Sequence, residues 1–245
     1  MSEQIKNDTC AYLGIDTSGK APIVTIKQND QRTVLCQNQN RFAGRDLASV
    51  VSQGLKQCGL DFSILAGISV STGPGSFTGL RVGLAYAKGL ATARSLALVG
   101  VSHFERINAC GMNGVYDIIV IPVNAKTFYL WRKDELQEVK NKLKPKGSIK
   151  VFDTLEELTE ELESVKSEER IACYAIDSKV AEAPTFNELM TNDRVNLTAT
   201  KMTAESLLEC AILEFANTNE ESWSELEPIY GRKSMAEINF ERKGN

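Results

Sequence analysis

Apolar and polar positions alternate along three short runs near the start of the chain. These runs are Cys10–Asp16, Pro22–Lys27 and Arg32–Cys36. Alternation with a period of two predicts strands with one buried face, and the polar residues 28–31 between the second and third runs predict a turn. We therefore expect three consecutive antiparallel strands, with Asp16 at the first bend.

A helical period replaces this alternation farther along the chain. Over Asp46–Cys58 the apolar residues return every three or four positions, and Gly59 supplies a stop signal. The apolar runs Ile64–Val70 and Leu96–Val101 flank a second helix that follows the turn at Gly73–Gly75. Strand, helix and strand in this order predict a parallel pair with a right-handed crossover.

The pattern then starts again, with a short helix over Phe104–Met112 and strands at Asp117–Val123 and Thr127–Trp131. Later segments predict an acidic amphipathic helix with Leu158 and Leu162 on its inner side, and a strand over 170–176.

The repetition predicts an α/β protein of two lobes, each a mixed sheet packed with helices. The expected division is 1–102 for the N-terminal lobe, 103–200 for the second lobe, and 201–245 for a C-terminal part that packs back on both. In this last part we expect a helix over Thr203–Phe215, capped by Thr203.

The stretch Gly73–Ala91 joins a glycine-proline turn to a helix, which Ser76 or Thr78 can cap. Small residues recur there at every fourth position and share one face of the helix, namely Gly79, Gly83, Ala87 and Ala91. A glycine in a helix interior costs about 0.8 to 1 kcal/mol relative to alanine. We therefore expect another backbone close to this face, from the same domain or from another chain.

Composition and charge describe an ordinary globular protein, with 42% hydrophobic and 24% charged residues and a net charge of -4. The negative charge disfavours unaided binding to nucleic acid. The six cysteines include no Cys-x-x-Cys pair, which excludes the usual zinc and disulfide patterns. A polar N-terminus and the lack of a long apolar run predict no export signal, no membrane anchor and a cytoplasmic location.

Known catalytic motifs do not fit the glycine-rich stretch. A P-loop needs a lysine and then Ser or Thr after its glycines, but Gly79 is followed by Leu80 and Arg81. Ser76 lacks the Gly-x-Ser-x-Gly spacing of a nucleophile elbow. His103 is the only histidine, which excludes a metal site built on a histidine pair, and we expect it to be structural or solvent-facing.

Two motifs together resemble the bacterial TsaB (YeaZ) family. They are the GPGSFTGLRVG sequence at Gly73–Gly83 and the preceding GIDTS at Gly14–Ser18, and the late EPIYGR at Glu227–Arg232 is similar to the family's Pro-x-Tyr-x-Arg ending. The middle of the chain departs from the family, because Asn124-Ala125-Lys126 stands where Asp-Ala-Arg and a glycine are usual. The resemblance implies a two-lobed actin-like, Hsp70-like (ASKHA) fold.

The resemblance also implies a role without catalysis. TsaB proteins are partners of TsaD, which makes N6-threonylcarbamoyladenosine at position 37 of tRNAs that read ANN codons, and the ATPase TsaE joins the assembly. No catalytic residue, cofactor or metal is implied for this chain, and tRNA would be reached only through the complex. The lone His103 fits this role, because the catalytic relative holds its metal through paired histidines.

In the family, the first two helices of TsaB pack against their counterparts in TsaD as a four-helix bundle. We therefore expect seven residues to form this interface or its immediate support: Leu47, Val51, Leu55, Gly79, Gly83, Ala87 and Ala91. A homodimer through the same surface is the competing assembly when TsaD is absent. Gly83→Leu is expected to block docking and leave a folded monomer.

A stand-alone ATP-using enzyme of the same fold, similar to a small-molecule kinase, is the alternative. Asp16, Thr17 and Ser18 are its candidate nucleotide-facing residues, which would be vestigial in a TsaB-like protein. Against this alternative, Val123–Phe128 lacks the aspartate and glycines of a second phosphate loop. A peptidase is disfavoured, because no nucleophile is paired with a base by spacing.

Overall fold

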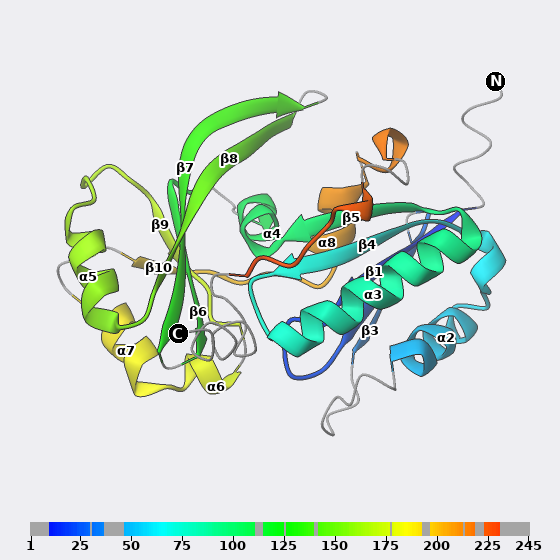
Figure 1. The fold of residues 1–245 in the computed structure, drawn as a ribbon, viewed down its shortest axis with the longest axis horizontal. Coiled ribbons are helices and arrows are strands. Elements are labelled where there is room, and N and C mark those ends of the chain that lie inside the picture. Colours follow the sequence, from blue (N-terminus) through cyan, green and yellow to red (C-terminus); the bar gives the residue numbers. More distant parts are fainter. Residues whose placement is uncertain are drawn as a thin grey trace, which may run out of the picture.

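A computed structural model gives the fold of the 245-residue chain (Figure 1). The structure describes residues 10–29, 31–36, 47–110, 115–124, 126–139, 142–176, 178–192, 197–212, 214–218 and 223–230, and for 31–36, 135–139, 142–146 and 217 only the backbone. Two five-stranded sheets lie next to each other and each is packed with helices, so the expected two-lobed α/β class is confirmed.

The first sheet has the strand order β3-β2-β1-β4-β5. β1 pairs antiparallel with β2, and β2 with β3, whereas β1, β4 and β5 run parallel. Both the three-stranded antiparallel start and the parallel pair around a helix are therefore confirmed. The strands are β1 (Ala11–Asp16), β2 (Ile23–Gln28), β3 (Gln31–Cys36), β4 (Leu65–Gly73) and β5 (Ala97–Ser102).

The second sheet, in the order β10-β9-β6-β7-β8, repeats this topology. β6, β7 and β8 form the antiparallel part, and β9 and β10 extend it in parallel on the other side of β6. We propose that residues 1–102 form the N-terminal lobe with the first sheet, that residues 103–200 form the second lobe with the second sheet, and that residues 201–245 form a C-terminal part that packs on both lobes. The strands are β6 (Ile118–Asn124), β7 (Thr127–Val139), β8 (Lys142–Phe152), β9 (Ile171–Cys173) and β10 (Leu197–Ala199).

Helices cover both faces of the first sheet. α2 (Leu47–Gln57) and α3 (Phe77–Arg94) lie on one face and share a continuous apolar core with it, and the short η2 (Phe62–Ile64) leads into β4 (Figure 1). The opposite face receives α8 (Ser206–Ala211) and η3 (Phe215–Asn217) from the C-terminal part of the chain.

The second sheet is packed with α5 (Leu155–Glu163), α6 (Ser178–Ala181) and α7 (Pro184–Met190). Leu158 and Leu162 of α5 are buried, as the sequence pattern predicts. α4 (His103–Cys110) connects the lobes, because it follows β5, contacts α8 and packs its Phe104 against Trp131 of β7.

Several elements differ in length from the expectation. β7 continues to Val139, beyond the expected end at Trp131. Its later residues are mostly charged and show no apolar alternation, but their backbone hydrogen-bonding groups pair with β8. β9 ends at Cys173, three residues before the expected end. The last helix spans Ser206–Ala211 and is shorter than expected at both ends, and the amide of Ser206 donates to the hydroxyl of the expected cap Thr203 at 3.2 Å. The turn that follows the helix places Phe215 against Gly67 of the sheet.

No helix in the described ranges combines the length and apolar character that a membrane span needs.

Candidate functional site

The glycine-rich turn after β4 receives the loop that follows β1. Gly73 has a φ of +95°, a conformation that favours glycine. The amide of Ser76 donates to the carbonyl of Ser18 at 2.7 Å, and the Ser76 hydroxyl accepts from the amide of Gly79 at 3.2 Å as the predicted helix cap. A Cβ on Gly75 would lie 2.6 Å from the Cβ of Ser18. In this structure the turn therefore binds a segment of its own chain.

The small face of α3 packs against the same loop. A Cβ on Gly79 would overlap the carbonyl oxygen of Thr17, and a Cβ on Gly83 would overlap the Thr17 hydroxyl. Thr17 is only 1% exposed. The close backbone approach expected at this face is thus made inside the N-terminal lobe, and Gly83→Leu would disturb the fold itself, contrary to the expectation of an intact monomer.

All seven residues expected at a partner interface are buried in the single chain. They are Leu47, Val51, Leu55, Gly79, Gly83, Ala87 and Ala91. Here they pack the two helices onto the sheet. Their part in an interface remains a proposal, as support for the outward residues of the same helices.

A second stripe of small residues lies on the outer side of α3, where Ala85, Gly89 and Ala93 are exposed. A Cβ on Gly89 would meet no atom within 4 Å, so nothing in the described chain explains this glycine. This outer stripe can be found in the sequence, because its small residues also recur at every fourth position, two positions after those of the buried stripe.

The end of α3 next to the turn is clamped by the C-terminal segment. The guanidinium of Arg81 lies 4.0 Å from the Phe77 ring centroid and 5.3 Å from that of Tyr230. Its Nε also donates to the Tyr230 hydroxyl at 2.8 Å. The amide of Ile229 donates to the carbonyl of Thr72 at 2.8 Å, which fixes this segment beside the end of β4.

A buried polar cluster occupies the carboxyl ends of the parallel strands, around Asp16. One Asp16 oxygen accepts from the amide of Ser18 at 3.0 Å and from its hydroxyl at 2.5 Å. The other oxygen forms an ion pair with Arg106 of α4. Arg106 also donates to the Ser206 hydroxyl at 3.1 Å and to the Thr203 carbonyl at 3.0 Å. The carboxylate that was a candidate for facing a nucleotide is therefore bound by protein groups here.

His103 completes the cluster and is fully buried, which fits the structural role expected for it. Its Nε2 lies 3.1 Å from the hydroxyls of both Ser18 and Ser71 and 3.7 Å from Asp16. Burial lowers the pKa of His103 below its ordinary value, although the nearby Asp16 opposes this shift. Burial would raise the pKa of Asp16, but Arg106, His103 and Ser18 together hold it well below its usual range.

The cluster does not have the geometry of a hydrolase triad. In such a triad the serine lies at one imidazole nitrogen and the carboxylate at the other. Here Ser18 and Asp16 both lie on the Nε2 side of His103, whereas its Nδ1 has no hydrogen-bond partner among the described groups. Ser18 also donates its hydroxyl proton to Asp16.

The space beside the cluster, between the two lobes, is small. It has a volume of about 60 Å³ and is bounded by Asp16, Arg106, Tyr174 and Met202, among others. This volume suits about two water molecules, whereas small-molecule sites usually have roughly 300 to 1,000 Å³. Asp16, Thr17 and Ser18 therefore contact the chain itself in this conformation.

Sequence inspection missed Arg106, the residue that neutralises Asp16. A signal for it exists, because Arg106 lies three residues after His103 in a helix and therefore shares its side. A charged residue beside the inward-facing Phe104 and Ile107 indicates a buried ion pair.

Fold and site define this chain as a two-lobed α/β protein whose two sheets share one topology, with a buried polar cluster between the lobes. Two solved structures from Pseudomonas aeruginosa share its fold. YeaZ has a TM-score of 0.62 at 20% identity, over 90% of this chain and 99% of that one. A protein described as similar to peptidase YeaZ has a TM-score of 0.66 at 21% identity, over 91% of this chain and 100% of that one.

Sequence comparisons match shorter parts of the chain. The family model of TsaD, tRNA N6-adenosine threonylcarbamoyltransferase, matches residues 41–122. The enzyme of that name from Geobacter sp. (strain M21) is 50% identical over 56 residues, 23% of this chain and 16% of that relative's length. The tRNA threonylcarbamoyladenosine biosynthesis protein TsaB of Haemophilus influenzae is 30% identical over 91 residues, 37% of this chain and 39% of that relative.

These matches confirm the resemblance to the TsaB (YeaZ) family that the motifs predicted. They relate the chain to proteins named for threonylcarbamoyladenosine biosynthesis, although it spans well under half of the length of these sequence relatives.

Proposed function

We propose that this protein is a non-catalytic, inactive paralogue of a TsaD-like threonylcarbamoyltransferase and activates that enzyme by binding it. The assembly would modify adenosine 37 of tRNAs that read ANN codons, in the cytoplasm, with a TsaE-like ATPase as third component. The observation that carries this proposal is the joint similarity to TsaB and TsaD, because the TsaD model matches residues 41–122, the segment that holds α2 and α3. The net charge of -4 supports contact with tRNA through the partner.

The outer face of α2 and α3 is the proposed docking surface. Residues 41–122, which match the TsaD model, include both helices, so a TsaD-like partner would present similar helices to this face. Like surfaces can pair around a pseudo-twofold axis, and the same face would support a homodimer when the partner is absent. Ala85, Gly89 and Ala93 let a facing helix approach closely, and the seven buried residues would hold the two helices in position.

Association of the purified chain with the TsaD of its own organism tests the proposal. Titration calorimetry should show a complex at micromolar concentration. Gly89→Leu should weaken it tenfold or more, because a bulky side chain in a tight contact costs about 1 to 3 kcal/mol. This variant should stay folded, since Gly89 has open space around it. Ala181→Leu, at an exposed position of α6, is the matched control.

Two outcomes would count against the proposal in different ways. If the unmodified chain forms no complex, the partner role is wrong. If Gly89→Leu binds as well as the control, the role stands and the outer stripe of α3 lies outside the interface. Calorimetry with ATP and magnesium tests the alternative, because tight binding with turnover by the isolated chain would favour a stand-alone ATP-using enzyme.

A further inference from the structure

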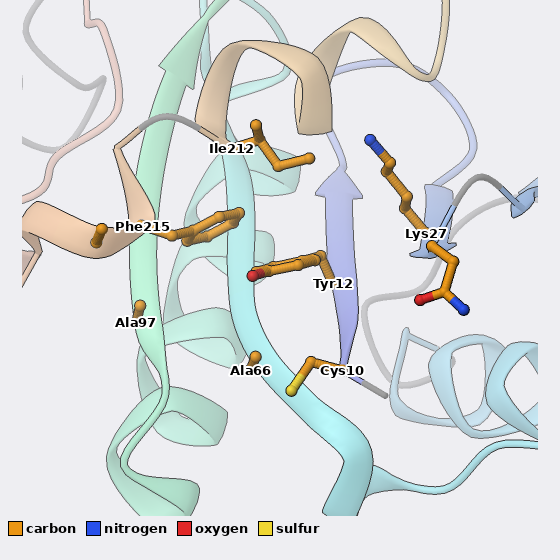
Figure 2. Close-up of a pocket in the computed structure, with 9 residues that line it drawn as sticks. Cys10, Tyr12, Lys27, Ala66, Ala97, Ile212 and Phe215 are labelled. Carbon is orange, nitrogen blue, oxygen red and sulfur yellow. The ribbon is translucent and has the colours of Figure 1, made fainter. Parts of the chain in front are cut away.

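A cavity of about 510 Å³ opens on the face of the first sheet that α8 and η3 cover (Figure 2). This face is opposite the one that holds α2 and α3. The volume lies within the range of roughly 300 to 1,000 Å³ that small-molecule sites occupy. The cavity is therefore separate from the proposed docking surface.

One row of residues across the sheet forms the floor. Lys27 pairs with Tyr12, Tyr12 with Gly67, and Gly67 with Ala97, so these residues share one face. Phe215 from η3 covers Gly67. A Cβ on Gly67 would lie 2.7 Å from the Phe215 ring. The Phe215 ring stacks on Tyr12 with 4.9 Å between centroids. Phe215 thus covers one face of the Tyr12 ring, and both Tyr12 and Lys27 remain partly exposed.

The backbone around the cavity is irregular in a way that opens it. β1 pairs Ala11 with Leu65 but Tyr12 with Gly67, so Ala66 is the extra residue of a β-bulge. Ala66 lines the cavity with only a methyl group (Figure 2). Bulges occur preferentially next to functional sites, where they re-aim side chains. Asn29, at the rim, has a positive φ of 53° in the turn after β2.

Charge enters the described part of the lining through Lys27. Among the described residues that line the cavity, none is an aspartate or glutamate. In the described part of the chain no carboxylate lies within ion-pair distance of its ammonium group. Figure 2 shows the Lys27 side chain extending on the far side of Tyr12 from Ala97, with Ile212 near the top of the cavity. A cation beside an aromatic and aliphatic wall complements an apolar ring with one negative charge.

We propose that this cavity binds a small aromatic monocarboxylate. The ring lies in the partly exposed part of the row, against Tyr12 and Ile212, and the carboxylate lies toward the ammonium group of Lys27. The aromatic wall of Tyr12 and Phe215 favours a planar ring, and the ammonium group of Lys27 favours an anion. Partial burial and the nearby Cys10 raise the pKa of Tyr12 above its ordinary value, which already keeps the hydroxyl neutral at pH 7.

Amide chemical shifts measured during titration of the full chain with benzoate test this proposal. Benzoate should bind with a dissociation constant of about 1 mM or below, as expected for so few heavy atoms. The largest shifts should come from residues 12, 27 and 97. Benzamide, which is uncharged, and cyclohexanecarboxylate, which is not planar, should each bind about tenfold more weakly.

Lys27→Met removes the charge with little change in length and should weaken benzoate binding about tenfold. Lys20→Met, at an exposed lysine away from the cavity, is the matched control and should bind as the unmodified chain does. Equal binding of benzoate and benzamide, or no effect of Lys27→Met, would overturn the proposed charge recognition. Equal binding of cyclohexanecarboxylate would overturn the aromatic class, and no shifts with 10 mM benzoate would overturn the site.

Discussion

Thr17 is the residue around which the glycine motif closes. Its carbonyl and hydroxyl contact α3 at Gly79 and Gly83, and the neighbouring Ser18 carbonyl accepts from the amide of Ser76. Two glycines in the interior of one helix are unfavourable for the helix alone. Their conformational cost is offset because the loop after β1 can approach the axis of α3.

Gly83→Ala should therefore destabilise the protein despite the better helix propensity of alanine. The added methyl group would overlap the Thr17 hydroxyl, and overpacking costs about 1 to 3 kcal/mol against a propensity gain of about 1 kcal/mol. We expect the free energy of unfolding to fall by about 1 kcal/mol, and by no more than about 2 kcal/mol, in urea titration at unchanged m-value. The further change Thr17→Ala should recover part of the loss, whereas a Gly83→Ala variant as stable as the unmodified chain would contradict this packing role.

At the scale of elements, α3 shows which features of a helix the sequence pattern predicts and which it does not. Its cap at Ser76 and its place between two parallel strands were predictable from local chemistry and from the order of apolar runs. Which stripe faces inward was not, because both stripes consist of glycine and alanine, whose apolar surfaces differ little. In α2, by contrast, Val51 and Leu55 stand out against polar neighbours, and the inner side follows from the period.

The polar cluster was harder to predict from the sequence than the helices were, because its residues meet only in the folded chain. Asp16, Ser71, His103 and Ser206 are far apart in the sequence, and the strand ends and α8 bring them together only in the assembled lobes. Their spacing along the chain carries no sign of this contact. Arg106 was detectable only as a charge on the inner side of a short helix.

Gly89→Ala on the outer side of α3 should have the opposite effect to Gly83→Ala. A Cβ at this position meets nothing within 4 Å, so only the helix propensity changes, by about 0.8 to 1 kcal/mol in favour of the folded state. Urea titration of the isolated chain should show this gain. A loss of stability would mean that the outer stripe has an intramolecular contact.

On the scale of the whole molecule, the pair Asp16 and Arg106 connects parts that lie far apart in the chain. Asp16 ends a strand of the first sheet, Arg106 lies on the helix between the lobes, and Thr203 and Ser206 belong to the C-terminal part. A buried pair of this kind stabilises the fold only while both groups are charged, and removal of one partner typically costs about 3 to 5 kcal/mol. The stability of the whole molecule should therefore depend on pH through this cluster.

Acidification should destabilise the protein in two separate steps. The pKa values of His103 and Asp16 are lower in the folded state than in the unfolded chain. In both cases the unfolded chain therefore binds the proton more readily, and the free energy of unfolding decreases as the pH is lowered. The first step begins near the unfolded histidine pKa of about 6.5, and the second near the unfolded aspartate pKa of about 3.9. Each proton contributes up to about 1.4 kcal/mol per pH unit.

His103→Gln separates the two steps, because His103 is the only histidine of the chain. No other side chain with an ordinary pKa changes charge between pH 5 and 7, so the variant should lose the slope of the free energy of unfolding in that range. The decline below about pH 4 should persist, since Asp16 still pairs with Arg106. Urea titrations at half-unit pH steps measure both slopes. If the slope between pH 5 and 7 persists in the variant, His103 is not buried in its neutral form, and the polar cluster does not hold the lobes together in the way described.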